Sequence, residues 1–138
     1  MPHFFLEYTD NIKTEARIPE LLAKVNKVLM AQGGVFPTGG IRSRAVELKE
    51  YCIADSGADY AFVHATLKIG SGRTEAEKKK TCDELFVMLR EHFADLFQKR
   101  YLALSMDFEE FSEAGTYKQN NLHARFKKLG QEETGVIG

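Results

Sequence analysis

The residue best suited to chemistry is Pro2, in the opening sequence Met1-Pro2-His3-Phe4. An initiator methionine is removed when the next residue is small, as proline is, and removal would give Pro2 a free secondary amine. An α-amino group titrates near ~7.7–8 in short peptides, so this amine could act as a general base at neutral pH. While Met1 is attached, the Pro2 nitrogen is an amide and cannot accept a proton. The alternative, that Met-Pro is an ordinary processing sequence without a function, stays open on the dipeptide alone.

Three arginines have the spacing of an anion site. Arg42 and Arg44 are two residues apart in a predicted strand, so both point to one side with Val46 and Leu48. Guanidinium groups on an apolar side need partners, and their planar fork suits carboxylates. Arg73 follows a Gly-Ser-Gly turn at a predicted helix start, where anions are favoured. That turn lacks the spacing of a P-loop or dinucleotide fingerprint. For Arg42 and Arg44 the alternative is pairing with nearby acids or exposure at a strand end.

The remaining polar side chains favour structural roles. The histidines are scattered, so we expect structural or surface roles and no metal site for His3, His64, His92 and His123. Cys52 and Cys82 lack metal-ligand spacing and lie among apolar residues, which predicts buried, reduced thiols in a cytosolic protein. Lys78-Lys79-Lys80 reads as a solvated helix face, and the sequence suggests no Ser/His/Asp arrangement.

The elements that position these residues form two βαβ halves, at about 2–54 and 60–111. The first half comprises a strand over 3–8, a helix with apolar spacing from Leu21 to Leu29 that Gly33-Gly34 ends, and a strand over about 41–53. The second half comprises a strand over 60–69, a long helix opened by a Thr74–Glu77 capping box and continuing to Phe97, and a strand over 102–108.

The two halves align at an offset of 60 residues, for example Val25 on Leu85 and Leu29 on Leu89. Two such units predict an α+β fold in which a four-stranded mixed sheet carries two helices on one face. The other face should be apolar, with Phe5 among its residues, and another subunit is its simplest cover.

Positions at which the two halves differ are candidates for function. The same offset places Pro2 on Phe62, Arg42 on Leu102 and Arg44 on Leu104. That any two βαβ units would align equally well is the chance alternative.

Composition restricts the class of protein. The chain has 138 residues and a net charge of −1, which indicates one soluble domain without the basicity typical of nucleic-acid binding. No apolar run approaches the ~20 residues of a membrane span, and no secretory or transit segment is recognisable. We therefore expect a cytoplasmic protein.

The chain resembles the tautomerase superfamily, and within it the 5-carboxymethyl-2-hydroxymuconate isomerase family. The stretches that carry the resemblance are Pro2-His3-Phe4, Asp10-Asn11-Ile12, Phe36-Pro37 with Gly40-Ile41-Arg42-Ser43-Arg44, residues 59–73 and residues 118–127. Several blocks in the right order over residues 2–127 are more specific than any single motif. Gly33-Gly34 shifts the loop before Phe36, and residues 128–138 have no recognised counterpart.

The resemblance implies a cofactor-independent isomerase of aromatic catabolism, as in homoprotocatechuate degradation, that forms a homotrimer and acts on a small polycarboxylate. It implies Pro2 as the base, Arg42 and Arg73 as catalytic carboxylate-binding residues, and Arg44 and Phe36 as substrate-binding residues. The domain would cover residues 1–127, with 128–138 as a polar tail that is either disordered or a lid. Alternatives are a phenylpyruvate-type keto–enol tautomerase, or a non-catalytic trimeric ligand-binding or scaffold protein if Met1 is retained.

Overall fold

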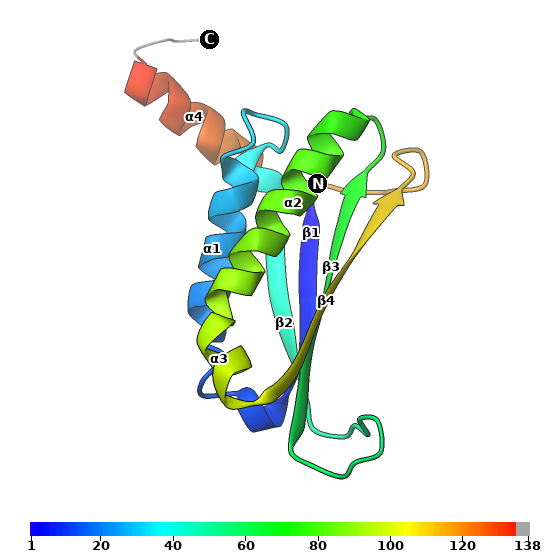
Figure 1. The fold of residues 1–138 in the computed structure, drawn as a ribbon. Coiled ribbons are helices and arrows are strands. Elements are labelled where there is room, and N and C mark those ends of the chain that lie inside the picture. The colour runs from blue at the N-terminus through cyan, green and yellow to red at the C-terminus, as the bar shows by residue number, and fades with distance from the viewer. Residues whose placement is uncertain (135–138) are drawn as a thin grey trace.

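The structure is a computed structural model that describes residues 1–134, with side chains described through residue 130. Four strands form one mixed sheet in the order β2-β1-β3-β4 (Figure 1). They are β1 (His3–Thr9), β2 (Arg42–Leu48), β3 (Tyr60–Gly70) and β4 (Tyr101–Phe111). β1 is parallel to β2, β3 is parallel to β4, and the central pair β1 and β3 is antiparallel. The predicted mixed sheet is confirmed.

The helices cover one face of this sheet (Figure 1). They are α1 (Ile18–Met30), α2 (Glu75–His92) and the short α3 (Ala94–Lys99). The capping box is present, because Thr74 Oγ1 accepts from the Glu77 N–H at 3.1 Å and Glu77 accepts from the Thr74 N–H at 2.9 Å. Gly33 and Gly34 both have positive φ angles, of 66° and 85°, just beyond the end of α1. This is the left-handed backbone that glycine allows after a helix.

Two predicted boundaries were wrong. The strand expected over 41–53 ends at Leu48, because its partner β1 ends at Thr9, the residue paired with Leu48. The long helix expected to reach Phe97 is interrupted at Phe93, which separates α2 from α3 and is itself fully buried. A side chain anchored in the core at the interruption explains why the apolar spacing continued across it.

The core lies between the sheet and the helices. Alternate strand residues face the helices and are buried: Phe4, Leu6 and Tyr8 from β1, and Ala61, Val63, Ala65, Leu67 and Ile69 from β3. They pack against the apolar stripes of the helices, which include Leu21, Val25, Leu29, Leu85 and Leu89. We call the opposite side of the sheet, away from the helices, the open face.

The alignment of the two halves at an offset of 60 is wrong in the strands. Arg44 lies on the open face with His3 and Phe5. Arg42, two residues before Arg44 in β2, lies on the same side of the sheet. Leu102 and Leu104 instead pack toward the helices. Phe62 likewise lies on the open face. Because side chains alternate along a strand, an odd shift between the halves moves every residue to the other side. The helical stripes keep the offset of 60, so the slip falls between helix and strand.

The open face carries four cross-strand rows, and it is less uniformly apolar than expected. From the N-terminal end, the first three rows are Arg42–His3–Lys68–Glu109, Arg44–Phe5–Thr66–Asp107 and Val46–Glu7–His64–Ser105. The last row joins the pairs Leu48–Thr9 and Phe62–Ala103, where the Phe62 N–H donates to Thr9 Oγ1 at 3.3 Å. The first two rows are basic on β2 and acidic on β4. His64 does contact a serine and an aspartate, with Nδ1 2.6 Å from Ser105 Oγ and Nε2 3.2 Å from Asp107 Oδ2. Only the last row, with Tyr60 and Tyr101 beyond it, is mainly apolar.

The C-terminal segment returns to the N-terminal end of the sheet. α4 (Leu122–Thr134) begins beside the short η2 turn (Thr38–Gly40) and projects away from the sheet (Figure 1). α4 therefore crosses the proposed boundary between residues 127 and 128. The part of the expected tail at 135–138 lies outside the described residues.

Two further features bear on the sequence expectations. Cys52 is exposed and Cys82 is half-buried, so the expectation of two buried thiols was wrong for Cys52, which lies in the loop after β2 rather than in a strand. Among residues 1–134, no helix is both long and apolar enough to cross a bilayer.

Candidate functional site

The site is built around the start of β1. Pro2 is buried, and its carbonyl accepts a hydrogen bond from the Arg42 backbone N–H at 3.0 Å, which extends the β1–β2 pairing by one step. Met1 is half-buried and lies against Gly40, where a Cβ atom would come within 3.2 Å of Met1 Cγ. The nitrogen of Pro2 is therefore held at the end of a paired strand, between β2 and the η2 turn.

Arg42 lies beside this position on β2. Its Nη1 donates to the carbonyls of Gly39, at 2.9 Å, and Ile41, at 3.1 Å. These bonds fix the guanidinium without neutralising it. Within residues 1–130 the structure gives Arg42 no carboxylate partner, so the alternative of a local ion pair is not what is observed.

Arg73 reaches the same region from the second half of the chain. Nη1 donates to the Gly70 carbonyl at 3.1 Å, and Nη2 donates to the Val35 carbonyl at 3.2 Å. The guanidinium carbon lies 5.0 Å from the centre of the Phe36 ring, a cation–π distance. Phe36 is only 3% exposed, so its ring forms a buried support for Arg73. Arg73 also has no carboxylate partner among the described side chains.

The segment after β4 adds charges that the sequence analysis missed. Ser71 N–H donates to the Phe111 carbonyl at 3.0 Å, which ties the Gly-rich turn to the end of β4. Glu113 packs directly on Gly70, where any side chain would collide with its carboxylate. Lys118 Nζ lies 3.4 Å from Glu113 Oε2. Both residues are in a loop without periodicity, and only the block 118–127 in the family resemblance pointed to Lys118.

The electrostatics of the amino terminus show that these groups converge. Burial is the main effect that lowers the pKa of the Met1 amino group, and the cationic side chains of Arg73, Lys118 and Arg42 lower it further. Glu113 acts in the opposite direction. Arg42 and Arg73, predicted from opposite halves of the chain, are therefore both close enough to act on an amine at this end of β1.

The α4 helix closes one side of the site. Asn120 Nδ2 donates to the Gly39 carbonyl at 2.8 Å, the same carbonyl that accepts from Arg42. Asn120 Oδ1 accepts from the Leu122 N–H at 2.6 Å and so satisfies the first backbone donor of the helix. A Cβ atom at Gly39 would lie 2.8 Å from the His123 nitrogen, so only glycine allows the helix to approach so closely.

Arg44 lies apart from Arg42 and Arg73, on the exposed part of the open face. Its Nη1 is 3.2 Å from His3 Nδ1, and its guanidinium carbon is 5.0 Å from the centre of the Phe5 ring. Burial lowers the pKa of His3, and Arg44 is the largest of the charges that lower it further. Since a guanidinium can only donate, His3 accepts at Nδ1 and carries its proton on Nε2.

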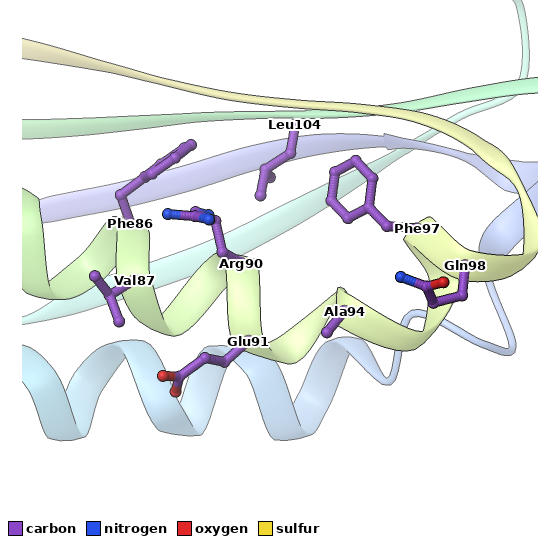
Figure 2. Close-up of a pocket in the computed structure, with 8 residues that line it drawn as sticks. All are labelled: Phe86, Val87, Arg90, Glu91, Ala94, Phe97, Gln98 and Leu104. Atoms are coloured by element: carbon purple, nitrogen blue, oxygen red, sulfur yellow. The ribbon is translucent and has the colours of Figure 1, made fainter.

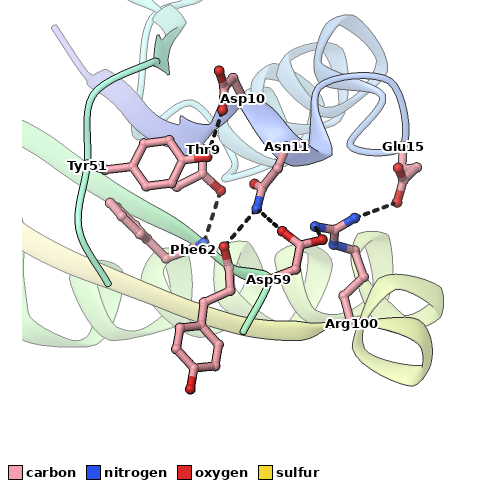
Figure 3. A network of polar contacts seen from close by, with 9 residues as sticks. Thr9, Asp10, Asn11, Glu15, Tyr51, Asp59, Phe62 and Arg100 are labelled. Atoms are coloured by element: carbon pink, nitrogen blue, oxygen red, sulfur yellow. Dashed lines mark hydrogen bonds and ion pairs between the residues drawn. The ribbon is translucent and has the colours of Figure 1, made fainter. Parts of the chain in front are cut away.

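Two other features lie away from this site. A cavity of about 650 Å³ lies between α2, α3 and β4 (Figure 2) and is lined by Phe86, Val87, Arg90, Glu91, Ala94, Phe97, Gln98 and Leu104. None of the candidate site residues lines it. A polar network at the other end of the sheet (Figure 3) joins Asn11 to Asp59, at 2.9 Å, and Asp59 to Arg100, at 2.8 Å. The block Asp10-Asn11-Ile12 therefore holds loops together far from Pro2.

Comparison with known proteins gives one consistent result. The sequence profile described as 5-carboxymethyl-2-hydroxymuconate isomerase matches residues 2–126. A 5-carboxymethyl-2-hydroxymuconate Delta-isomerase from Escherichia coli is 48% identical over 127 residues, which are 92% of this chain and 100% of that protein.

Solved structures agree with the sequence matches. The crystal structure of a 5-carboxymethyl-2-hydroxymuconate isomerase from Deinococcus radiodurans R1 is 57% identical, with a TM-score of 0.86 over 91% of this chain and 93% of that one. A second structure, described as a 5-carboxymethyl-2-hydroxymuconate delta-isomerase, is 28% identical, with a TM-score of 0.84 over the same shares of the two chains. A more remote protein, described as a fused 4-OT symmetric trimer, shares the fold at 15% identity and a TM-score of 0.59, over 88% of this chain and 98% of that one.

Proposed function

Because this chain belongs to the 5-carboxymethyl-2-hydroxymuconate isomerase family and is therefore an isomerase, we propose that it ketonises 5-carboxymethyl-2-hydroxymuconate by proton transfer through Pro2. The single observation that carries the proposal is that Arg42 and Arg73 both act on the amino group of Met1, directly beside the buried Pro2 at the start of β1. Neither arginine has a carboxylate partner among the described side chains, so both can receive the carboxylates of a substrate.

The reaction proceeds after Met1 has been removed, when the Pro2 nitrogen is a secondary amine. The neutral amine takes the proton of the 2-hydroxyl group of the dienol. The electron pair of that O–H bond forms the 2-oxo group, and the double bonds shift along the chain. The proton is then returned to the distal carbon, which gives the 2-oxo-3-ene isomer. No electrons are gained or lost, and the number of protons is unchanged because Pro2 returns one proton for the one that it takes up.

The arginines supply charge that is already in place. Arg42 and Arg73 bind carboxylates, and one of them stabilises the negative charge that develops on the 2-oxygen. Arg73 is held by two carbonyls and the Phe36 ring, so it needs little rearrangement when the substrate arrives. Phe36 would act mainly by positioning Arg73, and Arg44 would extend substrate binding onto the open face. The domain that carries all five residues would be 1–127.

We also propose that the active form is a homotrimer. The open face has an apolar end at Phe62, Tyr60 and Tyr101, and Tyr101 is 70% exposed in the single chain. The two free edges of the sheet differ in charge, with Arg42 and Arg44 on β2 and Asp107 and Glu109 on β4. Contacts between unlike surfaces are head-to-tail, and three such contacts can close into a ring. A distant relative described as a symmetric trimer has the same fold.

An ultraviolet assay tests the proposed reaction. Protein whose intact mass shows that Met1 is absent should convert the conjugated dienol of 5-carboxymethyl-2-hydroxymuconate to its oxo isomer with saturation kinetics. Phenylpyruvate, which has one carboxylate, should be a much poorer substrate because it can satisfy only one arginine. Preference for phenylpyruvate would favour a keto–enol tautomerase, and no turnover of either compound would favour a binding protein.

A further inference from the structure

A second basic surface adjoins the N-terminal site on the open face. It is a groove of about 490 Å³ lined by His3, Phe5, Arg44, Lys68, Phe111, Gly115 and Thr116. We call it the Lys68 groove. None of the lining residues is acidic, although Glu109 is the cross-strand neighbour of Lys68 on β4. The groove therefore has the charge of an anion site.

The cations of the Lys68 groove are arranged without acidic partners. Arg44 is held over the Phe5 ring and against His3 Nδ1. Lys68 is half-buried and is paired in register with His3 across the β1–β3 ladder. Among residues 1–130, the structure gives Lys68 and Arg44 no ion pair. The third polar group is the Nε2–H of His3, since Nδ1 already accepts from Arg44.

The Lys68 groove lies next to the site around Pro2 along β1 and β2. His3 directly follows Pro2, and the amino terminus, Arg42, Arg44 and Lys68 all lower the pKa of His3 together with its burial. His3 is therefore close to the charges of both the Lys68 groove and the site around Pro2. Arg42 and Arg44 are two residues apart in β2, and two residues of extended strand span about 7 Å. A branched acid with a six-carbon main chain can bridge that distance.

We propose that the Lys68 groove is a carboxylate subsite, in which Lys68 and Arg44 bind a carboxylate that the Arg42–Arg73 pair leaves free. This assignment rests on the proposed function and extends it to substrate selection. A tricarboxylate such as 5-carboxymethyl-2-hydroxymuconate would fill the groove, whereas a dicarboxylate would leave it empty. Lys68 is a binding residue that selects among substrates, and it takes no part in proton transfer.

The kinetic test compares two dienols in assembled, Met-free protein. Lys68→Met keeps the length of the side chain and removes its charge. It should lower kcat/KM for 5-carboxymethyl-2-hydroxymuconate roughly tenfold to a hundredfold, while kcat/KM for 2-hydroxymuconate changes by less than about threefold. Lys68→Arg should keep most of the activity on the tricarboxylate. Lys49→Met, an exposed lysine beyond the far end of β2, is the matched control.

A binding test separates failure of the subsite from failure of the proposed reaction. Propane-1,2,3-tricarboxylate and glutarate differ by one carboxylate and do not react. The tricarboxylate should raise the melting temperature of the wild-type and Lys49→Met proteins more than glutarate does, and Lys68→Met should abolish that difference. If this holds but the dienol is not turned over, the subsite stands and the proposed reaction fails. Equal losses on both dienols, or an unchanged preference in Lys68→Met, would overturn the subsite.

Discussion

At the scale of single residues, the site depends on cations that are fixed by neutral groups. Arg42 and Arg73 donate to backbone carbonyls of Gly39, Ile41, Gly70 and Val35, so their positions are set but their charge is not cancelled. A guanidinium paired with a protein carboxylate would be a weaker ligand for a substrate carboxylate. The same charges act on the amine, which links substrate binding to the protonation state of the proposed base.

The first prediction concerns Pro2. Protein that retains Met1, verified by intact mass, should lose roughly a hundredfold to ten-thousandfold of kcat, because an amide nitrogen cannot take up the proton. Pro2→Ala should retain a small part of the activity, since it leaves a primary amine in the same place. Steady-state kinetics on the dienol measure both effects. Full activity in a Met1-retaining sample would exclude Pro2 as the base.

The second prediction concerns Arg73 and pH. Arg73 lowers the pKa of the amino terminus, so we expect the same effect on the Pro2 amine, which is then neutral to a lower pH. Arg73→Ala should reduce kcat/KM roughly tenfold to a hundredfold. It should also move the acidic limb of the kcat/KM profile to higher pH, because the amine stays protonated longer as the pH rises. Arg73→Lys should rescue only partly, because it lacks the fork.

A matched arginine serves as the control for this prediction. Arg90 is exposed and lies in the cavity between α2 and β4, away from the site (Figure 2). Arg90→Ala should leave both the rate and the pH profile unchanged. If Arg73→Ala slowed the reaction without moving the acidic limb, Arg73 would act on the substrate but not on the base.

At the scale of elements, His92 joins the two halves of the chain. Its Nε2–H donates to the Ala16 carbonyl at 2.7 Å, and its Nδ1 accepts from Lys24 Nζ at 3.1 Å. Both nitrogens are used as in a neutral ring. Burial, followed by Lys24 and Arg17, lowers the pKa of His92, although the bond to Ala16 opposes the shift.

The third prediction follows from that geometry. Because the unfolded chain protonates His92 more readily than the folded chain does, stability from the neutral ring is present above pH ~6.5 and is lost as the pH falls through the lower folded pKa. His92→Gln keeps a donor but does not titrate, so it should lose less stability between about pH 7 and 5 than the wild type. His92→Ala should be destabilised by about 1–3 kcal/mol at neutral pH. Urea unfolding across pH measures both, and parallel curves for wild type and His92→Gln would contradict the prediction.

The elements also show how far the sequence could predict this molecule. Apolar periodicity, the Thr74 cap and the glycines after α1 predicted the mixed sheet and the placement of Arg73 at a helix start. The repeat was misleading for Arg42 and Arg44, because matching apolar residues along the chain does not determine which strand side they occupy. A shift of one residue between helix and strand leaves the apolar stripes of the helices aligned, but it moves every strand side chain to the opposite face of the sheet. Glu113 and Lys118 lie in an aperiodic loop, so periodicity could not place them at the site, and only the block 118–127 of the family resemblance included Lys118.

At the scale of the whole molecule, the open face of the sheet is charged at one end and apolar at the other. β2 presents Arg42 and Arg44 to the open face, whereas β4 presents Asp107 and Glu109. The cross-strand rows change from charged near the N-terminus to apolar at the far end, so a neighbouring chain would pack against the far end, away from the Lys68 groove. Apolar burial at that end supplies most of the free energy of association, and it leaves Arg42 and Arg44 unpaired and available to the substrate.

The last prediction is that the chain forms a stable trimer through the apolar end of the open face, which leaves the Lys68 groove at the other end accessible to the substrate. Analytical ultracentrifugation at micromolar concentration should give one species of three times the chain mass. Phe62→Asp places a charge within the apolar row, and because burying an unpaired carboxylate is unfavourable it should shift the species toward monomer. Val87→Asp is the control, because Val87 is 51% exposed on the outer side of α2 and should leave the mass unchanged. A wild-type chain that sediments as a monomer at this concentration would exclude the trimer, and a Phe62→Asp variant that still sediments as a trimer would move the interface to another surface.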